Sequence, residues 1–286
     1  MIAHLFPGQG SEGPDMAGDA LSRPGPVREL VDRASRALEL DLEALLARAD
    51  PQLARTEVGQ PALIAISLGL ALETKETPAA TAGHSVGELA AFSLAGCISP
   101  EDAIDCVVAR SRFMAEAARK FPGTMAAVRA RNAEEVEQAL AIGSEAGQVE
   151  LAAHNAPEEW VLTGDRAALA AITSRFATVQ LPVTGPWHSR AMSDAATQWR
   201  LCLERLTWKP PRIPVVANST GRFIREGDDL IQLLVGQLTQ PVRWATSLQT
   251  LAAAGITTWK IFGPGRVLRG LCRANLGNTV HVELNP

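Results

Sequence analysis

The sequence has little net charge, few cysteines and no long apolar run. Its 27 Lys and Arg residues nearly balance its 31 Asp and Glu residues, which gives a formal net charge of −4. Because there is no overall basic field, nucleic-acid binding is not expected, and an acidic partner would have to meet a local cluster of basic side chains. No stretch approaches the roughly 18 apolar residues of a membrane span, so no membrane association is expected.

The four cysteines give no sign of pairing or of metal binding. They are Cys97, Cys106, Cys202 and Cys272, and they lie without paired spacing inside apolar, helix-like patterns. Such placement is typical of buried free thiols in a reducing compartment and indicates neither disulfides nor a zinc site. The opening stretch MIAHLFPGQG has too short an apolar run for a signal peptide. We therefore expect a cytoplasmic protein without a metal.

Length and pattern predict one large α/β unit that carries a smaller insertion. The chain has 286 residues, of which 47% are hydrophobic and 20% are charged, as in a soluble protein with a sizeable core. Strand and helix patterns alternate outside the insertion, which favours a mainly parallel sheet. Strands are expected at 2–6, 79–83, 212–221 and 259–265, and helical structure at 27–48, 61–75, 86–96, 103–120 and 228–238 and after the last glycine turn.

Residues 123–187 have a different pattern. Strands are predicted at 124–130, 149–154, 160–164 and 177–183, with helices at 132–142 and 165–176. The resulting order β-α-β-β-α-β is that of a ferredoxin-like unit. We therefore expect a large subdomain made of residues 1–122 and 188–286, and a ferredoxin-like small subdomain made of residues 123–187.

The stretch TAGHSVGELAAF at 81–92 places Ser85 between Gly83 and Gly87. A run of small residues precedes the serine and a helical pattern follows it, which is the strand–turn–helix order of a nucleophile elbow. Small flanking residues are needed there so that the hydroxyl stays exposed on a tight turn. An ordinary turn is the alternative interpretation, since the short motif also occurs by chance.

A serine nucleophile needs a base within hydrogen-bond reach. His4 and His281 are interpreted as structural, and His84 should face away from the serine because neighbours on a strand point to opposite faces. His188, in TGPWHSRAM, lies where the insertion rejoins the main chain and is the best-placed base. From spacing alone, a histidine that only packs in the core remains the alternative.

Seven short motifs occur in a fixed order along nearly the whole chain. They are FPGQGS at 6–11, QPA at 60–62, GHSVGE at 83–88, RSRFM at 110–114, GPWHS at 185–189, Q-x-x-x-P-V-x-W at 237–244 and GPGRVL at 263–268. Together they resemble the malonyl-CoA:acyl-carrier-protein transacylases of fatty acid synthesis and the acyltransferase domains of polyketide synthases. With the elbow, this predicts an α/β-hydrolase-like core with an inserted ferredoxin-like subdomain.

The resemblance implies a mechanism for five residues and implies no cofactor. Ser85 would attack a malonyl thioester and form an acyl-enzyme, and His188 would act as general base and then as general acid. The backbone carbonyl of Gln237 would orient the imidazole, in place of a carboxylate. The backbone N–H groups of Gln9 and Val86 would form the oxyanion hole.

The resemblance also implies how the substrate is chosen. Arg110 would hold the malonyl carboxylate with two parallel hydrogen bonds, whereas Arg112 would point elsewhere. Trp187 stands where malonyl-selecting members usually carry an aromatic residue, often Phe, and should crowd an α-substituent. Asn155 would line the cleft by analogy. Glu12 departs from the second Gln of many relatives and adds negative charge near the mouth.

The expected partners are malonyl-CoA and an acyl carrier protein. Arg266, Arg269 and Arg273 recur at i, i+3 and i+7, which predicts a basic stripe for an acidic carrier, with a solvated helix face as the alternative. A monomer is expected. Three other functions stay open: an acyl-carrier thioester hydrolase with the same Ser–His pair, the transacylase subunit of malonate decarboxylase, and a non-catalytic scaffold. The hydrolase would have no use for a buried guanidinium at Arg110.

Overall fold

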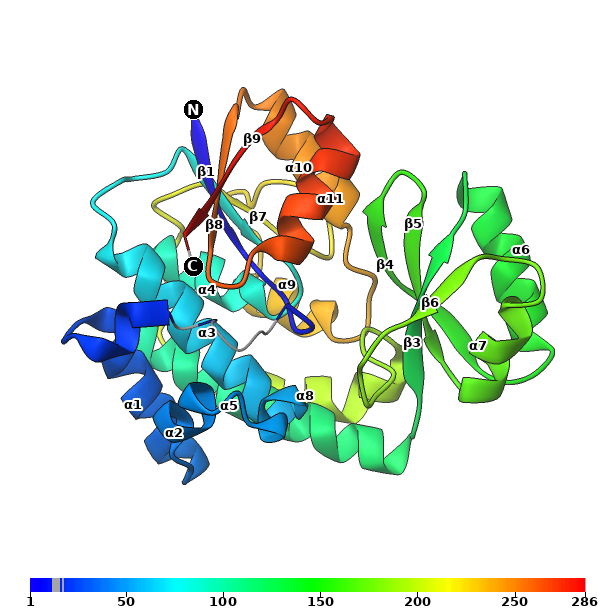
Figure 1. Cartoon of the computed structure of the whole chain (residues 1–286), viewed down its shortest axis with the longest axis horizontal. Helices are drawn as coiled ribbons and strands as arrows, with labels where there is room; N and C mark the ends of the chain where they lie inside the picture. The colour runs from blue at the N-terminus through cyan, green and yellow to red at the C-terminus, as the bar shows by residue number, and fades with distance from the viewer. Residues whose placement is uncertain (12–15, 17, 286) are drawn as a thin grey trace.

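The computed structural model describes residues 1–11, 16 and 18–285 and contains two separate sheets (Figure 1). The larger sheet has five strands in the order β7-β2-β1-β8-β9, and every neighbouring pair is parallel. Its strands are β1 (Ile2–Phe6), β2 (Ala80–Gly83), β7 (Val215–Val216), β8 (Thr258–Phe262) and β9 (His281–Asn285). The prediction of a mainly parallel sheet is confirmed, with the apolar run of β1 at its centre.

Helices cover both faces of this sheet. In Figure 1, α10 and α11 lie on one side of it and α3, α4 and α5 lie on the other. The α-helices of this part are α1 (Pro26–Leu38), α2 (Leu42–Ala47), α3 (Thr56–Glu73), α4 (Gly87–Leu94), α5 (Pro100–Lys120), α8 (Ser193–Leu203), α9 (Leu230–Gln237), α10 (Trp244–Ala253) and α11 (Arg266–Leu276). Short 3-10 turns are Gly18–Ser22, Pro51–Ala54 and Arg190–Met192. The helix α3 is apolar on all sides because it is almost fully buried.

Two helix predictions need correction. The helical stretch 27–48 is broken after Leu38, since Glu39 adopts a left-handed φ of 58° and the Asp41 side chain accepts a hydrogen bond from Ala44 N and so starts α2. The helix predicted to begin at Pro61 begins at Thr56 and contains the proline. Burial of nearly the whole helix outweighs the hydrogen bond that the proline removes.

Two strand predictions also differ from the structure. Only Val215–Val216 of the expected strand 212–221 pairs in the sheet, because Pro214 cannot donate a hydrogen bond and the chain turns back through an Ala217 N–Arg222 O bond. The strand β9 was not predicted at all. It pairs with β8 along its whole length, from Thr258 with His281 to Phe262 with Asn285.

The smaller sheet is antiparallel and has the strand order β4-β5-β3-β6. Numbered within its own β-α-β-β-α-β unit, this is the order 2-3-1-4 of a ferredoxin-like sheet, so the predicted fold class is confirmed. Its elements are β3 (Thr124–Arg129), α6 (Ala133–Ser144), β4 (Val149–Ala156), β5 (Glu159–Gly164), α7 (Arg166–Ile172) and β6 (Thr178–Gln180). The turn between β4 and β5 lies at Pro157 and Glu158, so Asn155 lies in the strand and not in the turn.

This smaller unit has a core of its own, which includes Val128, Val136, Leu162 and Ile172. We therefore propose that residues 123–187 form a subdomain distinct from residues 1–122 and 188–286. The two parts are joined by a short parallel bridge, in which His154 N donates to Val242 O and Val242 N donates to Ala152 O, both at 2.9 Å.

The cysteines are all free thiols. Cys97, Cys106 and Cys272 are buried, as expected, whereas Cys202 is only half-buried. Burial raises the pKa of each of the three buried thiols to about 12, so they are protonated at neutral pH. No helix in the described part of the chain is both long and apolar enough to span a membrane.

The turn between β2 and α4 is packed against backbone on both sides. Ser85 at its apex has a φ of 51°, in the left-handed region. A Cβ on Gly83 would lie 2.0 Å from the carbonyl carbon of Gly87, and one on Gly87 would lie 2.5 Å from the carbonyl oxygen of Phe6. The two glycines therefore allow strand, turn and helix to approach more closely than any other residue type would.

We expect Gly83→Ala to lower the free energy of unfolding by at least about 3 kcal/mol, because both clashing groups are backbone and cannot swing aside. Urea denaturation would measure this. Gly270→Ala is the matched control, since a Cβ there meets nothing within 4 Å and helix propensity alone should stabilise α11 by up to about 1 kcal/mol. Equal stability of the two variants would contradict this account of the turn.

Candidate active site

The structure brings Ser85 and His188 together from 103 residues apart in the sequence. The distance from Ser85 Oγ to His188 Nε2 is 2.8 Å, which is a hydrogen bond. Both residues have left-handed backbone angles, with φ of 51° and 57°. Residues other than glycine and asparagine seldom adopt this conformation, and such strain is concentrated at functional sites.

The other imidazole nitrogen is fixed by the end of α9. His188 Nδ1 lies 2.7 Å from the backbone oxygen of Gln237, the last residue of that helix. A carbonyl only accepts hydrogen bonds, so Nδ1 carries the proton and Nε2 has the free lone pair that faces Ser85 Oγ. Burial lowers the pKa of His188 to about 3, outweighing the Gln237 bond. The imidazole is therefore neutral and able to accept a proton at pH 7.

A buried guanidinium is connected to this pair through Gln237. Arg110 on α5 is only 1% exposed. Its Nη1 donates to Gln60 Oε1 at 2.5 Å and its Nη2 donates to Gln237 Oε1 at 2.7 Å. Arg112, two residues further on, is exposed, as predicted. Burial lowers the pKa of Arg110 to about 10, which still leaves it charged at neutral pH.

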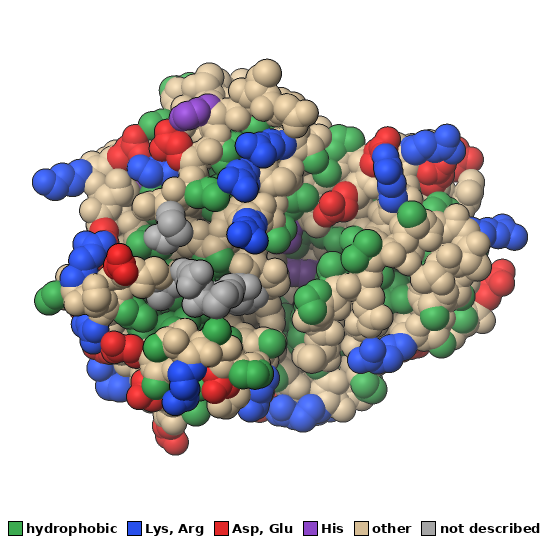
Figure 2. Space-filling model, in the orientation of Figure 1, with side chains coloured by type: hydrophobic (Ala, Val, Ile, Leu, Met, Phe, Trp, Pro, Cys, Tyr) green, Lys and Arg blue, Asp and Glu red, His purple; other side chains and the backbone are tan. Residues whose placement is uncertain are grey.

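A cavity of about 190 Å³ lies beside the Ser85–His188 pair. Ser85, His188, Gln9 and Gln60 line it, whereas Arg110 is reached through Gln60. Both parts of the chain supply walls, including Met125, Ala127, Ala153 and Val161 from the small sheet and Val267, Leu268 and Leu271 from α11. Figure 2 shows histidine side chains at the bottom of the hollow between the two parts.

Trp187 and Asn155 also line the cavity. Trp187 is 4% exposed and packs so tightly on Gly185 that a Cβ there would lie 2.3 Å from the indole ring. Asn155 Oδ1 lies 2.9 Å from His84 Nε2, and Asn155 Nδ2 donates to Glu159. His84 is thus committed to Asn155. Glu12 lies outside the described residues.

Gln9 and Val86 flank the serine from two directions. Val86 is the residue before α4, and Gln9 lies in the loop after β1. The Gln9 side chain accepts hydrogen bonds from Thr56 Oγ1 at 2.7 Å and from Gln60 Nε2 at 3.0 Å. Among the described residues, neither backbone N–H donates a hydrogen bond to the backbone carbonyl of a turn or loop.

Three residues that the sequence did not single out complete the site. Asn218 Oδ1 accepts from Ser85 N at 2.7 Å, and Asn218 Nδ2 donates to Gly83 O at 2.6 Å. Glu88 and Gln60 are buried beside Gln237 and Arg110. Glu88 belongs to the GHSVGE motif, but an acidic residue in the first turn of a helix is common and gave no sign of its buried partners. Nothing local marks Asn218, which acts across 133 residues.

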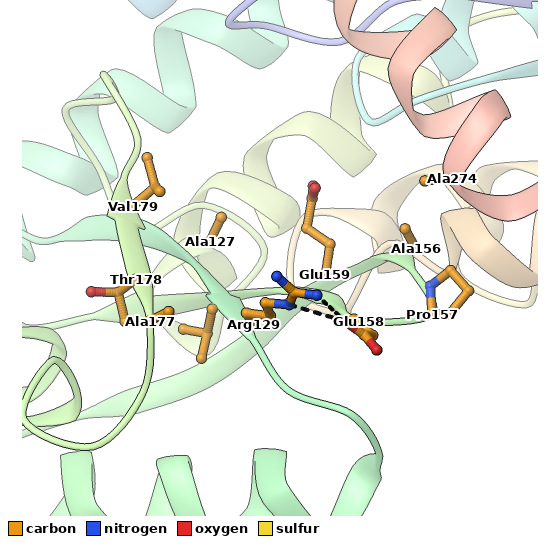
Figure 3. A pocket seen from close by; sticks show the side chains of 11 residues that line it. Ala127, Arg129, Ala156, Pro157, Glu158, Glu159, Ala177, Thr178, Val179 and Ala274 are labelled. Carbon is orange, nitrogen blue, oxygen red and sulfur yellow. Dashed lines mark hydrogen bonds and ion pairs between the residues drawn. The ribbon is translucent and has the colours of Figure 1, made fainter. Parts of the chain in front are cut away.

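A second, wider hollow of about 650 Å³ adjoins the cavity and shares Ala127 and Glu159 with it. Figure 3 shows Ala274 of α11 near the Ala156 end of β4, with the Arg129–Glu158 ion pair among the residues that line this hollow. Since α11 borders both hollows, it lies at the mouth of the site. Arg266 and Arg273 on this helix are exposed and Arg269 is half-buried, and Figure 2 shows basic side chains gathered over α11.

The described residues contain no group of three or more His, Cys, Asp or Glu side chains arranged to hold a metal ion. The arrangement that is present consists of a hydroxyl and a neutral imidazole in one cavity, with a buried cation bonded to the cavity residue Gln60. These are the parts needed to form and break a covalent acyl ester on serine while a negatively charged group is held nearby.

Comparison with known proteins gives a consistent result. Residues 3–258 match the acyl transferase domain family. The malonyl CoA-acyl carrier protein transacylase of Bacillus subtilis (strain 168) is 36% identical over 283 residues, which cover 95% of this chain and 89% of that protein.

Solved structures agree with the sequence match. The malonyl-CoA:acyl carrier protein transacylase of Xanthomonas oryzae pv. oryzae superposes with a TM-score of 0.90 at 34% identity, covering 100% of this chain and 95% of that one. A malonyl-transacylase in complex with a type II PKS acyl-carrier protein gives 0.90 at 29% identity, covering 99% and 95%. The chain therefore belongs to the malonyl-CoA:acyl-carrier-protein transacylase family of acyl transferases.

Proposed function

We propose that the protein transfers a malonyl group from coenzyme A to the phosphopantetheine thiol of an acyl carrier protein. The observation that carries this proposal is the 2.8 Å contact of Ser85 Oγ with a tautomer-fixed His188, in a cavity whose wall residue Gln60 is bonded to the buried Arg110. The family's relatives are named for this reaction.

The first half-reaction acylates the enzyme. His188 Nε2 takes the Ser85 proton as Oγ forms a bond to the thioester carbonyl carbon. When the carbon–sulfur bond breaks, the imidazolium returns that proton to the departing thiolate of coenzyme A, which leaves a malonyl ester on Ser85. The second half-reaction is the reverse with the carrier thiol, so the two substrates react in turn at one site.

The tetrahedral intermediate places negative charge on the former carbonyl oxygen. The backbone N–H groups of Gln9 and Val86 are proposed to donate to this oxygen. Val86 directly precedes α4, so its N–H also lies at the positive end of the helix dipole. Preorganised donors of this kind are typically worth about 3–4 kcal/mol each in the transition state.

Arg110 is proposed to select the diacid. Its guanidinium now donates to two neutral amide oxygens, and the malonyl carboxylate would replace them with charged acceptors, which bind more strongly. Trp187 would crowd a branched acyl group at the other wall, although one methyl group is worth only about 1–3 kcal/mol. A hydrolase for uncharged acyl chains, the strongest alternative, would gain nothing from this buried cation.

The basic stripe on α11 is proposed to dock the carrier protein. Arg266, Arg269 and Arg273 lie on the helix that borders both the cavity and the outer groove. A carrier docked there would present its thiol at the mouth of the cavity. Acyl carrier proteins are acidic, so the charges would be complementary.

We expect wild-type enzyme mixed with malonyl-CoA to gain the mass of one malonyl group, and Ser85→Ala to gain none, because no other hydroxyl among the described residues is bonded to His188. Intact-mass spectrometry measures both. Methylmalonyl-CoA and acetyl-CoA, tested in parallel, should give less adduct. An adduct of equal yield on Ser85→Ala would remove Ser85 as the nucleophile.

Arg110→Ala should slow acylation by malonyl-CoA about a hundredfold or more, the loss expected for two hydrogen bonds to a charged group. Acylation by acetyl-CoA should change far less, since that substrate has no carboxylate. Arg112→Ala, an exposed arginine on the same helix, is the matched control. A similar loss for both substrates would show that Arg110 only supports the fold.

Reversing Arg266, Arg269 and Arg273 to Glu should raise the KM for carrier protein about tenfold and leave malonyl-CoA hydrolysis unchanged. Steady-state assays with each acceptor measure these quantities. Reversal of the exposed Arg36, Arg48 and Arg175 makes the same change in net charge away from α11. If both triple variants gave the same KM, the stripe would not be a docking site.

A further inference from the structure

Arg110 is a buried cation without a direct anionic partner in the described part of the chain. Its two terminal nitrogens donate to the amide oxygens of Gln60 and Gln237, and its Nε has no hydrogen-bond partner there. An isolated buried charge is costly, so a compensating anion should be close. The carboxylate that acts on Arg110 electrostatically is Glu88, which is 0% exposed.

The hydrogen bonds around Glu88 favour its carboxylate form. One oxygen accepts from Asn218 N at 2.7 Å, and the other accepts from Gln237 Nε2. Because N–H donors face both oxygens, a carboxyl proton would have no acceptor. Glu88 also lies in the first turn of α4, where the helix dipole favours negative charge. Desolvation by burial nevertheless outweighs these donors and Arg110 and raises the pKa of Glu88 to about 7, so the carboxylate form predominates only above neutral pH.

The side-chain amide of Gln237 connects the two charges. Its Nε2 donates both to Glu88 and to Ser85 O, the latter at 2.8 Å. With its NH₂ group committed to two acceptors, the amide must turn its oxygen toward Arg110 Nη2. The backbone oxygen of the same residue serves His188. Gln237 therefore has a second task that is separate from orienting the base.

The Gln237 amide between Glu88 and Arg110 leaves the guanidinium more accessible to a substrate carboxylate than a direct salt bridge would. A direct Glu88–Arg110 pair would occupy the guanidinium with a charged acceptor that a substrate could displace only at high cost. An intervening amide balances the charge while presenting a neutral acceptor, which a substrate carboxylate can replace.

We propose that Glu88 is a positioning residue for diacid selection, which acts by fixing the Gln237 amide so that Arg110 stays aimed and available for the substrate carboxylate. This inference rests on the proposed malonyl transfer. It assigns the main effect of Glu88 to Arg110, because the Ser85 turn, which also receives a hydrogen bond from Gln237 Nε2, is held in addition by two hydrogen bonds of the Asn218 side chain.

Glu88→Gln tests the assignment. A glutamine of the same shape can accept from only one of the two donors, so either Asn218 N or the Gln237 amide loses its partner. Two second-order rates of Ser85 modification would be measured by quenched intact-mass spectrometry: acylation by malonyl-CoA, and sulfonylation by phenylmethanesulfonyl fluoride. The sulfonyl fluoride is uncharged, so it reports the Ser–His pair without Arg110.

In Glu88→Gln, malonyl acylation should fall about tenfold to a hundredfold, the range for loss of a hydrogen bond to a charged group. Sulfonylation should fall less than about threefold. Asn218→Ala, which releases the Ser85 turn, should slow both reactions by the same factor. Glu101→Gln, exposed at the start of α5, is the matched control and should match the wild type in both.

Equal losses for the two reagents in Glu88→Gln, or no loss of malonyl acylation, would overturn the assignment. If thermal melting shows Glu88→Gln to be unfolded, Glu88→Asp carries the same test, because the shorter side chain keeps the negative charge but cannot reach both Asn218 N and the Gln237 amide. Failure of the wild type to be acylated by malonyl-CoA would instead refute the proposed function, so the two failures are distinguishable.

Discussion

The site depends first on one hydrogen bond, from His188 Nδ1 to the backbone oxygen of Gln237. Carbonyl groups in the last turn of a helix lack intrahelical partners and carry the negative end of the helix dipole. Gln237 is the last residue of α9, so the helix end does the work that a carboxylate does in a Ser-His-Asp triad. It does so without adding a second buried anion near Glu88 and the substrate carboxylate.

The positive charge of Arg110 is surrounded by the side-chain amides of glutamines. Gln9, Gln60 and Gln237 form a chain of side-chain amides around the single buried cation. Each amide can donate and accept at once, so it transmits orientation from one group to the next without carrying a net charge. These amides therefore surround Arg110 without placing another charge in direct contact with it.

The sequence predicted the features that are local. The elbow could be identified because glycine spacing and the strand–helix order are contained within 81–92, and the small sheet could be identified because its six elements follow one another. Features that depend on distant partners could not. The break after Leu38 is set by backbone conformation, β9 forms only because β8 offers an edge, and Asn218 matters only because folding brings it to Ser85.

Motif resemblance supplied what spacing could not, namely that His188 and Arg110 belong with Ser85. The resemblance gave no role to Glu88. This residue is part of the GHSVGE motif, but its hydrogen-bond partners lie on other elements. Residues that act through a second residue leave no pattern in a single sequence, because their geometry is set entirely by the packing of separate elements.

The bridge between β4 and Val242 has a mechanical consequence. Val242 follows Gln237 by five residues, and the neighbouring Ala153 lines the cavity. The segment that follows Gln237, whose backbone oxygen accepts the His188 hydrogen bond, is thus hydrogen-bonded to β4, which forms the opposite wall of the pocket. Because of these two hydrogen bonds, any displacement of β4 relative to the large sheet would also strain the segment that leads back from Val242 to the end of α9.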